Sequence, residues 1–548
     1  MIKRVIRSKV KEVLESLYPE HKDTPFEVEV PKNEAFGDYS TNVALVLKGK
    51  VGKNPREIAQ NFVNRLSKED YFSKLEIAGP GFINFWIAED FYRKNLRNLL
   101  EKGDEFFKLD LGKGQRVLVE FVSANPTGPL HIGHGRGAAY GDSIARILAQ
   151  GGFSVVKEYY INDQGTQMNT LGKSVYLRAK ELTGEKIEFP EDGYQGAYIY
   201  DIAKLALEKY PNLLSLSEDE AIALCRDLAI EVILEDIRRD LETFRVSFDS
   251  WYSERTLFER GVVARVFKLL EERGLTYEKD SALWFRAKDF GDEKDRVLRK
   301  STGDYTYFAS DIAYHYEKFF ERGFDLCINL WGADHHGYVP RLKAAMKALG
   351  VPEEKLRIIL IQMVNLLEGK ELKSMSTRRG EFVELKELIS EVGTDAVRFI
   401  FLSRSSDSPL DFDVELTKKQ SQENPVYYVQ YAHARICSVF AKAEEKGIKP
   451  NILEANLAFL QEKEELKLLK LIDHFDDVLE SSILQLAPYK ITYYLMDLAS
   501  AFHDYYTKYR IIQDDEELTQ ARLALCEGLR RVLKQGLDLL GVSAPEKM

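Results

Sequence analysis

The chain has 548 residues, of which 45% are hydrophobic and 30% charged, as in ordinary globular proteins of roughly two to four domains. Its 77 lysines and arginines stand against 88 aspartates and glutamates, and the net charge of -11 argues against a protein that coats nucleic acid by bulk charge, although local basic patches remain open. No apolar run is long enough to span a bilayer, so we expect no membrane partner. The 4 cysteines lie far apart and have no metal-binding or disulfide spacing, so we expect no structural metal and a reducing, cytoplasmic location.

The first segment, residues 1–105, is predicted to be a small α/β domain. It opens with apolar side chains spaced for one face of a helix. A second helix is expected over residues 54–66, with a proline in its first turn, and strands are expected around residues 26–30 and 79–85. The polar stretch 101–110 is interpreted as a linker to the next domain.

The second segment, residues 106–424, alternates short apolar runs with helical patterns, which predicts a doubly wound parallel sheet of the Rossmann type. A long helical stretch interrupts this alternation and is interpreted as an insertion at about residues 165–290. The expected strands of the sheet are residues 117–122, 155–161, 326–331 and 357–363.

The most informative motif lies near the start of this segment. An apolar run and a small polar loop lead to His-Ile-Gly-His at residues 131–134, which opens a helical pattern ending at Gly151. A strand, a tight loop and a helix N-terminus form a ready phosphate site, because free backbone N–H groups and the helix dipole favour an anion. His131 and His134 offer two imidazoles for phosphates, and Gly133 offers bare backbone for a flat base. Histidines that merely cap a helix are the alternative.

A second motif, residues 374–380, reads Ser-Met-Ser-Thr-Arg-Arg-Gly and follows the last expected strand of the sheet. A loop that carries hydroxyls and cations is suited to cover a triphosphate and to stabilise charge that develops in the transition state. Alone this signature loop is a weak signal, and it becomes specific because it follows the His-Ile-Gly-His motif in this order.

The third segment, residues 425–548, shows helical periodicity throughout and is predicted to be an all-α bundle. Aromatic rings and cations alternate in two of its helical stretches, which suits the binding of splayed-out single-stranded bases. Rings half buried where helices pack are the alternative. The expected helices are residues 426–443, 464–479, 486–512 and 518–540, and the expected RNA contacts are Tyr427, Tyr431, Tyr505, Tyr509 and Arg510.

Taken in order, these motifs resemble the class I aminoacyl-tRNA synthetases and, within them, the arginyl-tRNA synthetase family. The resemblance covers nearly the whole length and includes Trp-Tyr-Ser-Glu at residues 251–254 and Trp-Gly-Ala-Asp-His-His at residues 331–336. It implies an N-terminal domain that contacts tRNA, a Rossmann catalytic core with a helical insertion, and an α-helical anticodon-binding bundle. It also implies a monomer that uses ATP with Mg²⁺ to activate L-arginine and transfers it to the 3'-terminal adenosine of the tRNA for arginine.

The resemblance further assigns site residues. A guanidinium needs a planar, bidentate acceptor, which Asp311 is expected to supply with Tyr307 as a second contact, while Asn125 meets the α-amino group and Glu120 serves either end. The catalytic roles fall on His131, His134, Lys373 and Arg378. The ATP contacts fall on Pro129, His131, Gly133, His134, Met375, Ser376, Thr377 and Arg378.

The signature loop departs from the family pattern at one place. Ser374 stands where the family usually has a lysine, and Gly128 stands where some members carry a compensating lysine. The cation that meets the triphosphate is therefore open among Lys373, Arg378 and Arg379.

Three other functions remain open from the sequence. Asp-His-His at residues 334–336 also occurs in metal-dependent phosphoesterases, which need further ligands at strand ends. An RNA-binding paralogue would usually have lost the ATP motif or the carboxylates for arginine. A synthetase for another amino acid would share the ATP motif, but the paired acids Glu120 and Asp311 favour a basic substrate.

Overall fold

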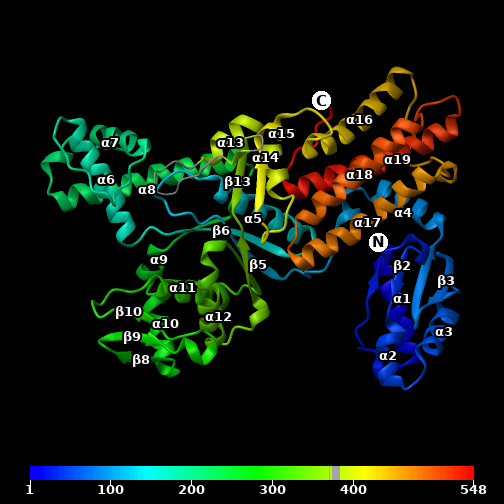
Figure 1. The fold of residues 1–548 in the computed structure, drawn as a ribbon, viewed down its shortest axis with the longest axis horizontal. Coiled ribbons are helices and arrows are strands. Elements are labelled where there is room, and N and C mark those ends of the chain that lie inside the picture. The colour runs from blue at the N-terminus through cyan, green and yellow to red at the C-terminus, as the bar shows by residue number, and fades with distance from the viewer. Residues whose placement is uncertain (369–370, 373–382) are drawn as a thin grey trace.

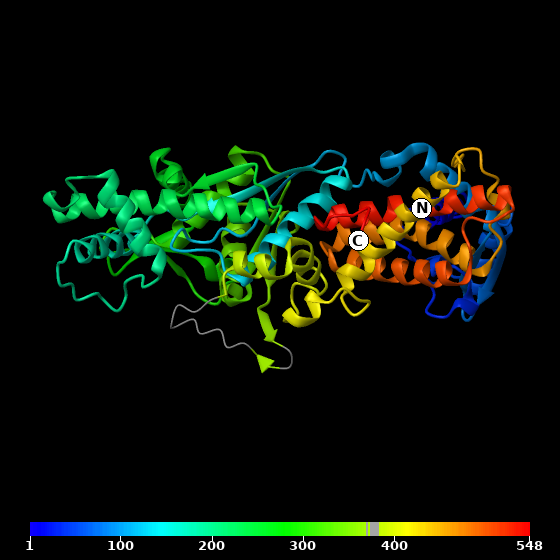
Figure 2. The same ribbon diagram turned by 90° about the horizontal axis from the view of Figure 1, so that it is seen from above.

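The computed structural model describes residues 1–368, 371–372 and 383–548. Figure 1 shows the parallel sheet and its helices near the centre, with the helical insertion (α6–α8) at one end of the long axis. The C-terminal bundle and the N-terminal domain lie at the other end, and Figure 2 shows the same order from above. The molecule is therefore elongated, with the parallel sheet between the helical insertion and the two terminal segments.

The N-terminal domain is built on a four-stranded antiparallel sheet of order β1-β2-β4-β3. The two expected helices are confirmed as α1 (Ile2–Leu17), which buries one apolar stripe, and α3 (Pro55–Leu66), which begins with its proline. The strand expected around residues 79–85 begins later, because Gly79 and Gly81 have positive φ angles and turn the chain between two strands. The other elements are β1 (Val28–Glu29), β2 (Tyr39–Thr41), α2 (Val43–Val51), β3 (Phe72–Ala78) and β4 (Phe82–Ile87).

The stretch expected as a linker, residues 101–110, is packed structure instead. α4 (Glu89–Lys102) continues into it and a 3-10 turn follows. Phe106 and Phe107 are buried there, and Phe107 packs edge-on against Phe475 of the C-terminal bundle, with ring centroids 5.5 Å apart. Two buried rings inside a polar run thus anchor the segment that joins the first two domains.

Five parallel strands form the central sheet, in the order β12-β11-β5-β6-β7. The four expected strands are present, but the first ends at Glu120 because Val122 and Ser123 have positive φ angles. The chain first adds strands on one side of β5 and later on the other, so the switch point lies between β5 and β11, where ligands bind at the carboxyl edge of such sheets. The strands are β5 (Arg116–Glu120), β6 (Ser154–Ile161), β7 (Ser250–Ser253), β11 (Leu326–Gly332) and β12 (Leu356–Ile361).

Two excursions leave this sheet. The helical insertion returns at β7, so a strand of the central sheet lies inside the block of residues 165–290 that the sequence predicted as helical. The second excursion, between β7 and β11, carries a small antiparallel sheet of order β10-β9-β8. Their elements are α6 (Thr166–Leu182), α7 (Ala197–Lys209), α8 (Glu218–Thr243), α9 (Arg255–Glu259), α10 (Val262–Glu272), β8 (Thr276–Lys279), β9 (Ala282–Phe285), β10 (Arg296–Arg299) and α11 (Tyr307–Tyr316).

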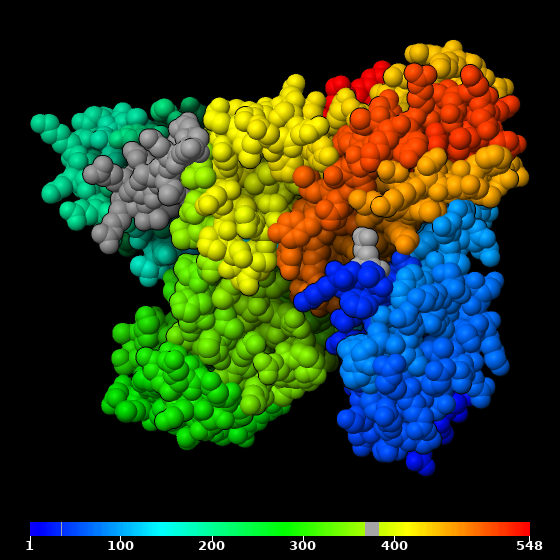
Figure 3. Space-filling view, turned by 45° about the vertical axis from the view of Figure 1, so that its right-hand side comes forward, coloured from blue at the N-terminus to red at the C-terminus, as the bar shows by residue number. Residues whose placement is uncertain are grey.

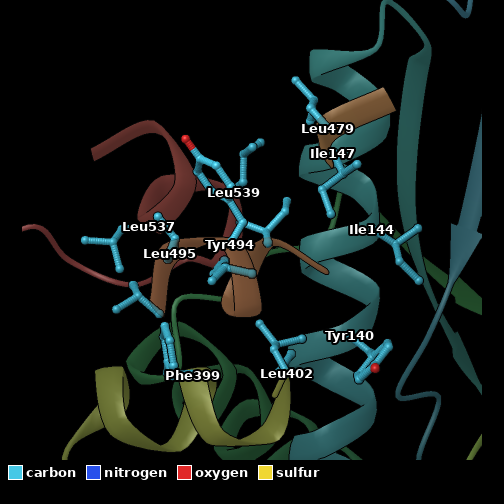
Figure 4. Packing of buried hydrophobic residues seen from close by; sticks show 14 of the residues in the cluster. Tyr140, Ile144, Ile147, Phe399, Leu402, Leu479, Tyr494, Leu495, Leu537 and Leu539 are labelled. Atoms are coloured by element: carbon cyan, nitrogen blue, oxygen red, sulfur yellow. The ribbon is translucent and has the colours of Figure 1, made fainter. Parts of the chain in front are cut away.

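The C-terminal bundle contains the four expected long helices and packs against α5 (Ile132–Gln150) of the second segment. Figure 4 shows Ile147 of α5 beside Leu479 of the bundle, and Leu402 near Tyr140. In Figure 3 the N-terminal domain and the second excursion form two lobes below the bundle, with a hollow between them. The helices are α16 (Pro425–Glu445), α17 (Lys463–Gln485), α18 (Tyr489–Lys508) and α19 (Glu516–Leu540).

A short connecting region lies between the sheet and the bundle. Its three strands have the order β14-β13-β15. Across the described part of the chain, no helix is long and apolar enough to cross a bilayer. The crossover helix between the parallel strands β11 and β12 is α12 (Val339–Ala348). The connecting elements are β13 (Val364–Glu368), β14 (Glu371–Leu372), α13 (Leu385–Val392), α14 (Thr394–Phe401), β15 (Leu410–Asp413) and α15 (Val414–Lys418).

Candidate active site and nucleic-acid interface

The loop from β5 to α5 places the His-Ile-Gly-His motif at the carboxyl edge of the sheet. His131 is the N-cap of α5, and its Nδ1 accepts hydrogen bonds from the backbone N–H groups of Gly133 and His134, at 3.1 and 3.3 Å. The Nδ1 of His134 accepts in turn from the backbone N–H of His131, at 3.3 Å. The two imidazoles stack with centroids 3.6 Å apart, so the histidines both cap the helix and lie together.

Both imidazoles are neutral. Burial lowers the pKa of His131, and it lowers the pKa of His134 to about 3. Because each Nδ1 accepts a hydrogen bond, we assign the proton of each neutral ring to Nε2. The pair therefore carries N–H donors rather than positive charges, and such donors can hydrogen-bond to phosphate oxygens.

The surroundings of the motif limit how a nucleotide could lie. A Cβ added at Gly133 would be 3.0 Å from Cε1 of His131, so the His131 ring covers one side of the backbone expected to receive a base. Pro129 is half-buried in the preceding loop. The Tyr198 hydroxyl donates to the carbonyl oxygen of Thr127 at 2.5 Å, so the helical insertion directly contacts the loop between β5 and α5.

Three carboxylates from different elements form an acidic cluster next to this loop: Glu120 ends β5, Glu254 follows β7, and Asp311 lies on α11. Glu120 and Glu254 are 7% and 3% exposed. The Lys318 ammonium is 2.5 Å from Oε2 of Glu120. Asp311 accepts a hydrogen bond from the Tyr338 hydroxyl, and the hydroxyls of Ser310 and Tyr160 lie beside the Glu254 carboxylate, which has no cation partner among the described residues.

The acidic cluster carries more negative than positive charge. Burial, together with the charges of Glu120 and Glu254, raises the pKa of Asp311 to about 7. Burial also raises the pKa of Glu254. With one lysine against three carboxylates in the described ranges, the cluster is suited to a further cation, and a guanidinium can meet two carboxylates in its plane.

The other two residues expected to bind arginine lie closer to solvent. Tyr307 is 55% exposed, at the start of α11. Asn125 is exposed, and its Nδ2 donates to Oε1 of Gln167 in α6 at 3.0 Å. The structure therefore brings the buried Glu120 next to the half-buried Asp311, whereas Asn125 and Tyr307 are exposed.

One member of the acidic cluster, Glu254, and its neighbour Lys318 were not predicted from the sequence. Glu254 belongs to the quoted Trp-Tyr-Ser-Glu stretch, but it follows a strand hidden within the expected insertion, so nothing local connected it to Asp311. Lys318 is 198 residues from its partner Glu120 and resembles a surface lysine in a helical pattern. The sequence signal that could have indicated Glu254 is its position directly after a short strand that contains Trp251 and Tyr252.

A concave site lies in the C-terminal bundle, where α16 and α18 contribute to a cavity of about 310 Å³. The rings of Tyr427 and Tyr431 stack with centroids 5.9 Å apart, and Tyr431 stacks on His503 at 5.7 Å. The Arg435 guanidinium lies 4.5 Å from the Tyr431 ring centroid. Half-buried rings beside one cation form a surface on which a base can stack.

The expected RNA contacts at the end of α18 lie elsewhere. Tyr505 is completely buried and its hydroxyl donates to Glu465 at 3.0 Å, so the expectation that this ring stacks on RNA is wrong. Its ring fills a seam between helices. Tyr509 is half-buried with its hydroxyl 3.0 Å from a Glu464 oxygen, and Arg510 is exposed.

Some expected site residues lie outside the described residues, namely Lys373, Met375, Ser376, Thr377, Arg378 and Arg379. The Asp-His-His stretch follows β11, and the side chains of Asp334 and His335 are 81% and 62% exposed. In the described ranges, no group of three or more histidines, cysteines or acids is arranged to hold a metal ion.

Comparison with known proteins identifies the family. A family model described as "tRNA synthetases class I (R), catalytic domain" matches residues 95–408. The arginine–tRNA ligase of Oleidesulfovibrio alaskensis is 52% identical over 525 residues, which are 95% of both chains. The chain belongs to the arginyl-tRNA synthetase family. The phosphoesterase interpretation of the Asp-His-His stretch is therefore set aside.

Further matches to this family extend over the whole length. The models "Arginyl tRNA synthetase N terminal domain" and "DALR anticodon binding domain" match residues 4–87 and 429–548. The arginine–tRNA ligase of Syntrophotalea carbinolica is 50% identical over 100% of both chains. A solved arginyl-tRNA synthetase from Thermus thermophilus has the same fold, with a TM-score of 0.79, 23% identity and 100% coverage of both chains.

Proposed function

We propose that this member of the arginyl-tRNA synthetase family activates L-arginine with ATP and transfers it to the tRNA for arginine. The observation that carries the proposal is the acidic cluster, in which Glu120, Glu254 and Asp311 face one lysine among the described residues. Burying carboxylates without cations is costly, and the guanidinium of arginine brings the missing charge in a planar, bidentate form.

In the first step, an oxygen of the arginine carboxylate attacks the α-phosphorus of ATP, and the bond from that phosphorus to the bridging oxygen breaks, releasing pyrophosphate. We assign the guanidinium to Asp311 and Glu254, with Tyr307 as a further contact, and the α-amino group to Asn125. Glu120, already paired with Lys318, completes the negative field of the pocket. The step gains from positioning and from charge stabilisation.

The contacts to ATP are assigned to two motifs, the His-Ile-Gly-His motif near the start of the second segment and the signature loop near its end. His131 and His134 donate from Nε2 to phosphate oxygens, and Pro129 and Gly133 line the nucleotide loop. Mg²⁺ accompanies ATP as a counter-ion of its phosphates, and we assign it no protein ligands. The signature loop supplies Lys373 and Arg378 as cations at the triphosphate, together with Met375, Ser376 and Thr377.

In the second step, a hydroxyl oxygen of the terminal ribose attacks the arginyl carbonyl carbon, the bond from that carbon to the phosphate oxygen breaks, and AMP leaves as the hydroxyl loses its proton. We assign anticodon bases to the cavity beside Tyr427 and Tyr431, with Tyr509 and Arg510 as outer contacts. The proposed domains are residues 1–105, 106–424 and 425–548, in a monomeric, cytoplasmic protein.

Arginine-dependent exchange of pyrophosphate into ATP tests this proposal. We expect exchange with arginine in the presence of the tRNA, and no exchange when lysine replaces arginine. In Asp311→Asn the rate of arginine-dependent exchange should fall by about 10²-fold or more. Folded protein that binds tRNA but supports no exchange would be an RNA-binding paralogue. Exchange driven by another amino acid would assign the site to a different substrate.

A further inference from the structure

Lys318 lies behind the arginine pocket and has no contact with solvent, because its side chain is 0% exposed. It sits in a single π-helical turn (Glu317–Glu321) after α11, a deviation that re-aims side chains. Its Nζ is 2.5 Å from Oε2 of Glu120, 3.2 Å from Oδ1 of Asn329 and 4.1 Å from the ring centroid of Tyr314. These protein groups occupy the three N–H directions of the ammonium, so Lys318 is placed to organise the pocket rather than to touch substrate.

Asn329 links Lys318 to His315 of helix α11 by hydrogen bonds. It lies opposite Glu120 in the register of β11 and β5 and is 0% exposed. Its amide lies 2.7 Å from Nε2 of His315, and Nδ1 of His315 lies 2.7 Å from the backbone carbonyl oxygen of Asp311. A carbonyl oxygen only accepts, so Nδ1 donates to it and Nε2 accepts from the Asn329 amide.

The charge state of His315 agrees with this assignment. Burial and the charge of Lys318 lower the pKa of His315 well below its usual value, so the ring is neutral and holds one proton. A neutral ring can donate at one nitrogen and accept at the other, as both contacts require. The path from Glu120 to the Asp311 backbone is therefore continuous and satisfied at every link.

We propose that Lys318 is a positioning residue for arginine: through Asn329 and His315, it fixes helix α11 against β5 so that Asp311 meets the guanidinium. This inference rests on the proposed function. A satisfied buried network holds the groups it connects in one geometry, and removing an outer member of such a network weakens binding. Because Lys318 contacts Glu120 at the end of β5 and Asn329 in the middle of β11, and none of the residues assigned to ATP, the effect should fall on arginine and not on ATP.

The test measures KM for arginine and for ATP by pyrophosphate exchange with tRNA present, in Lys318→Met and in Asn329→Ala. We expect KM for arginine to rise about tenfold or more in both variants. KM for ATP and kcat should change by no more than about twofold, since the chemical step keeps its contacts. Asn329→Ala breaks the hydrogen-bond network between Lys318 and His315 without removing a charge. It therefore tests the positioning role even if Lys318→Met does not fold.

Arg522→Met is the matched control, because Arg522 forms a buried ion pair with Glu465 in the distant bundle, 2.8 Å apart. It should lower the melting temperature and leave KM for arginine within about twofold of wild type. An unchanged KM for arginine in both test variants, or equal losses for arginine and ATP, would overturn the positioning role. Absence of arginine-dependent exchange in the wild-type protein would instead overturn the proposed function itself.

Discussion

Asp311 and Glu254 are carboxylates that the fold holds next to one another without a cation of their own among the described residues. Such groups reduce the stability of the free protein, because burial penalises their charge. They are expected where a ligand supplies the missing charge, and raised pKa values in a cleft mark such places. The acidic cluster is therefore better explained by binding than by folding.

The pKa of Asp311, about 7, predicts that arginine binding depends on pH. Below this pH the carboxyl group holds a proton that the guanidinium must displace, so KM for arginine should fall as pH rises from about 6 to about 8. Stability has the opposite dependence: the folded pKa exceeds the unfolded one, so the Asp311 contribution is present at low pH and is lost as pH rises through 7. Steady-state kinetics at each pH will check this, and Asp311→Asn should abolish the pH dependence.

Glu254→Gln should separate binding from stability. The change keeps the shape and removes a buried carboxylate that has no cation partner among the described residues, so we expect kcat/KM for arginine to fall by about 10²-fold with no loss of melting temperature. Glu465→Gln is the contrasting variant, because Glu465 is paired with Arg522 and its loss should cost about 3 kcal/mol. Calorimetry gives the melting temperatures, and pyrophosphate exchange gives kcat/KM for arginine. A Glu254→Gln variant that is destabilised but keeps its kcat/KM would contradict the assignment of Glu254 to the guanidinium.

Among the elements, those bounded by local signals are the ones that the sequence predicted well. The proline that begins α3 and the histidine cap and glycine end of α5 act within a few residues, so the pattern alone places both helices. The end of β5 was missed because Val122 adopts a positive φ that its residue type disfavours. Strand β7 was missed because only its pairing with β6 identifies it.

The same distinction applies to the candidate site. The His-Ile-Gly-His motif is contiguous and is visible in the sequence, and the family resemblance points to Glu120 and Asp311, which the structure places next to each other. Lys318 and Glu254 enter the site only by tertiary contacts across the fold, which no local pattern encodes. Tyr505 shows the converse, since an aromatic stripe looks the same in sequence whether its rings are buried or exposed.

The end of α19 predicts a requirement for glycine. Gly541 has a φ of 65°, and an added Cβ would clash with the Arg398 guanidinium, which is held by the carbonyls of Leu540 and Phe244. We expect Gly541→Ala to cost about 3 kcal/mol, from backbone strain and overpacking together. Gly447→Ala is the control, because Gly447 also has a positive φ but no neighbour within 4 Å, and it should cost about 1 kcal/mol. Equal losses in denaturant unfolding would contradict the clash.

The bundle cavity predicts a separable effect on tRNA. Tyr431 stacks on both Tyr427 and His503, so Tyr431→Ala should raise KM for tRNA by about tenfold or more and leave KM for arginine unchanged. Tyr493→Ala, at an exposed tyrosine of α18 outside the cavity, serves as the control. Aminoacylation kinetics give both constants, and an unchanged KM for tRNA in Tyr431→Ala would remove the cavity from the RNA interface.

For the whole molecule, a line of ion pairs joins the N-terminal domain to the bundle. Arg4 and Arg7 of α1 reach Asp476 and Glu480 of α17, with N–O distances of 2.8 Å. We expect Asp476→Asn with Glu480→Gln to increase hydrogen exchange in α1 while protection of the central sheet is unchanged, since the network spans only this interface. A matched change within the bundle, Glu464→Gln, should leave α1 protected. Equal exchange in all three proteins would show that apolar packing alone holds the interface.

Recognition of a guanidinium by buried carboxylates is the central claim, and a comparison of arginine with citrulline tests it most directly. Citrulline has nearly the same shape, but its urea group carries no charge and offers fewer donors. We expect kcat/KM for citrulline in tRNA-dependent pyrophosphate exchange to be lower than for arginine by about 10⁴-fold, because the carboxylates stay unpaired. Comparable kcat/KM values for the two substrates would contradict the proposed role of the acidic cluster.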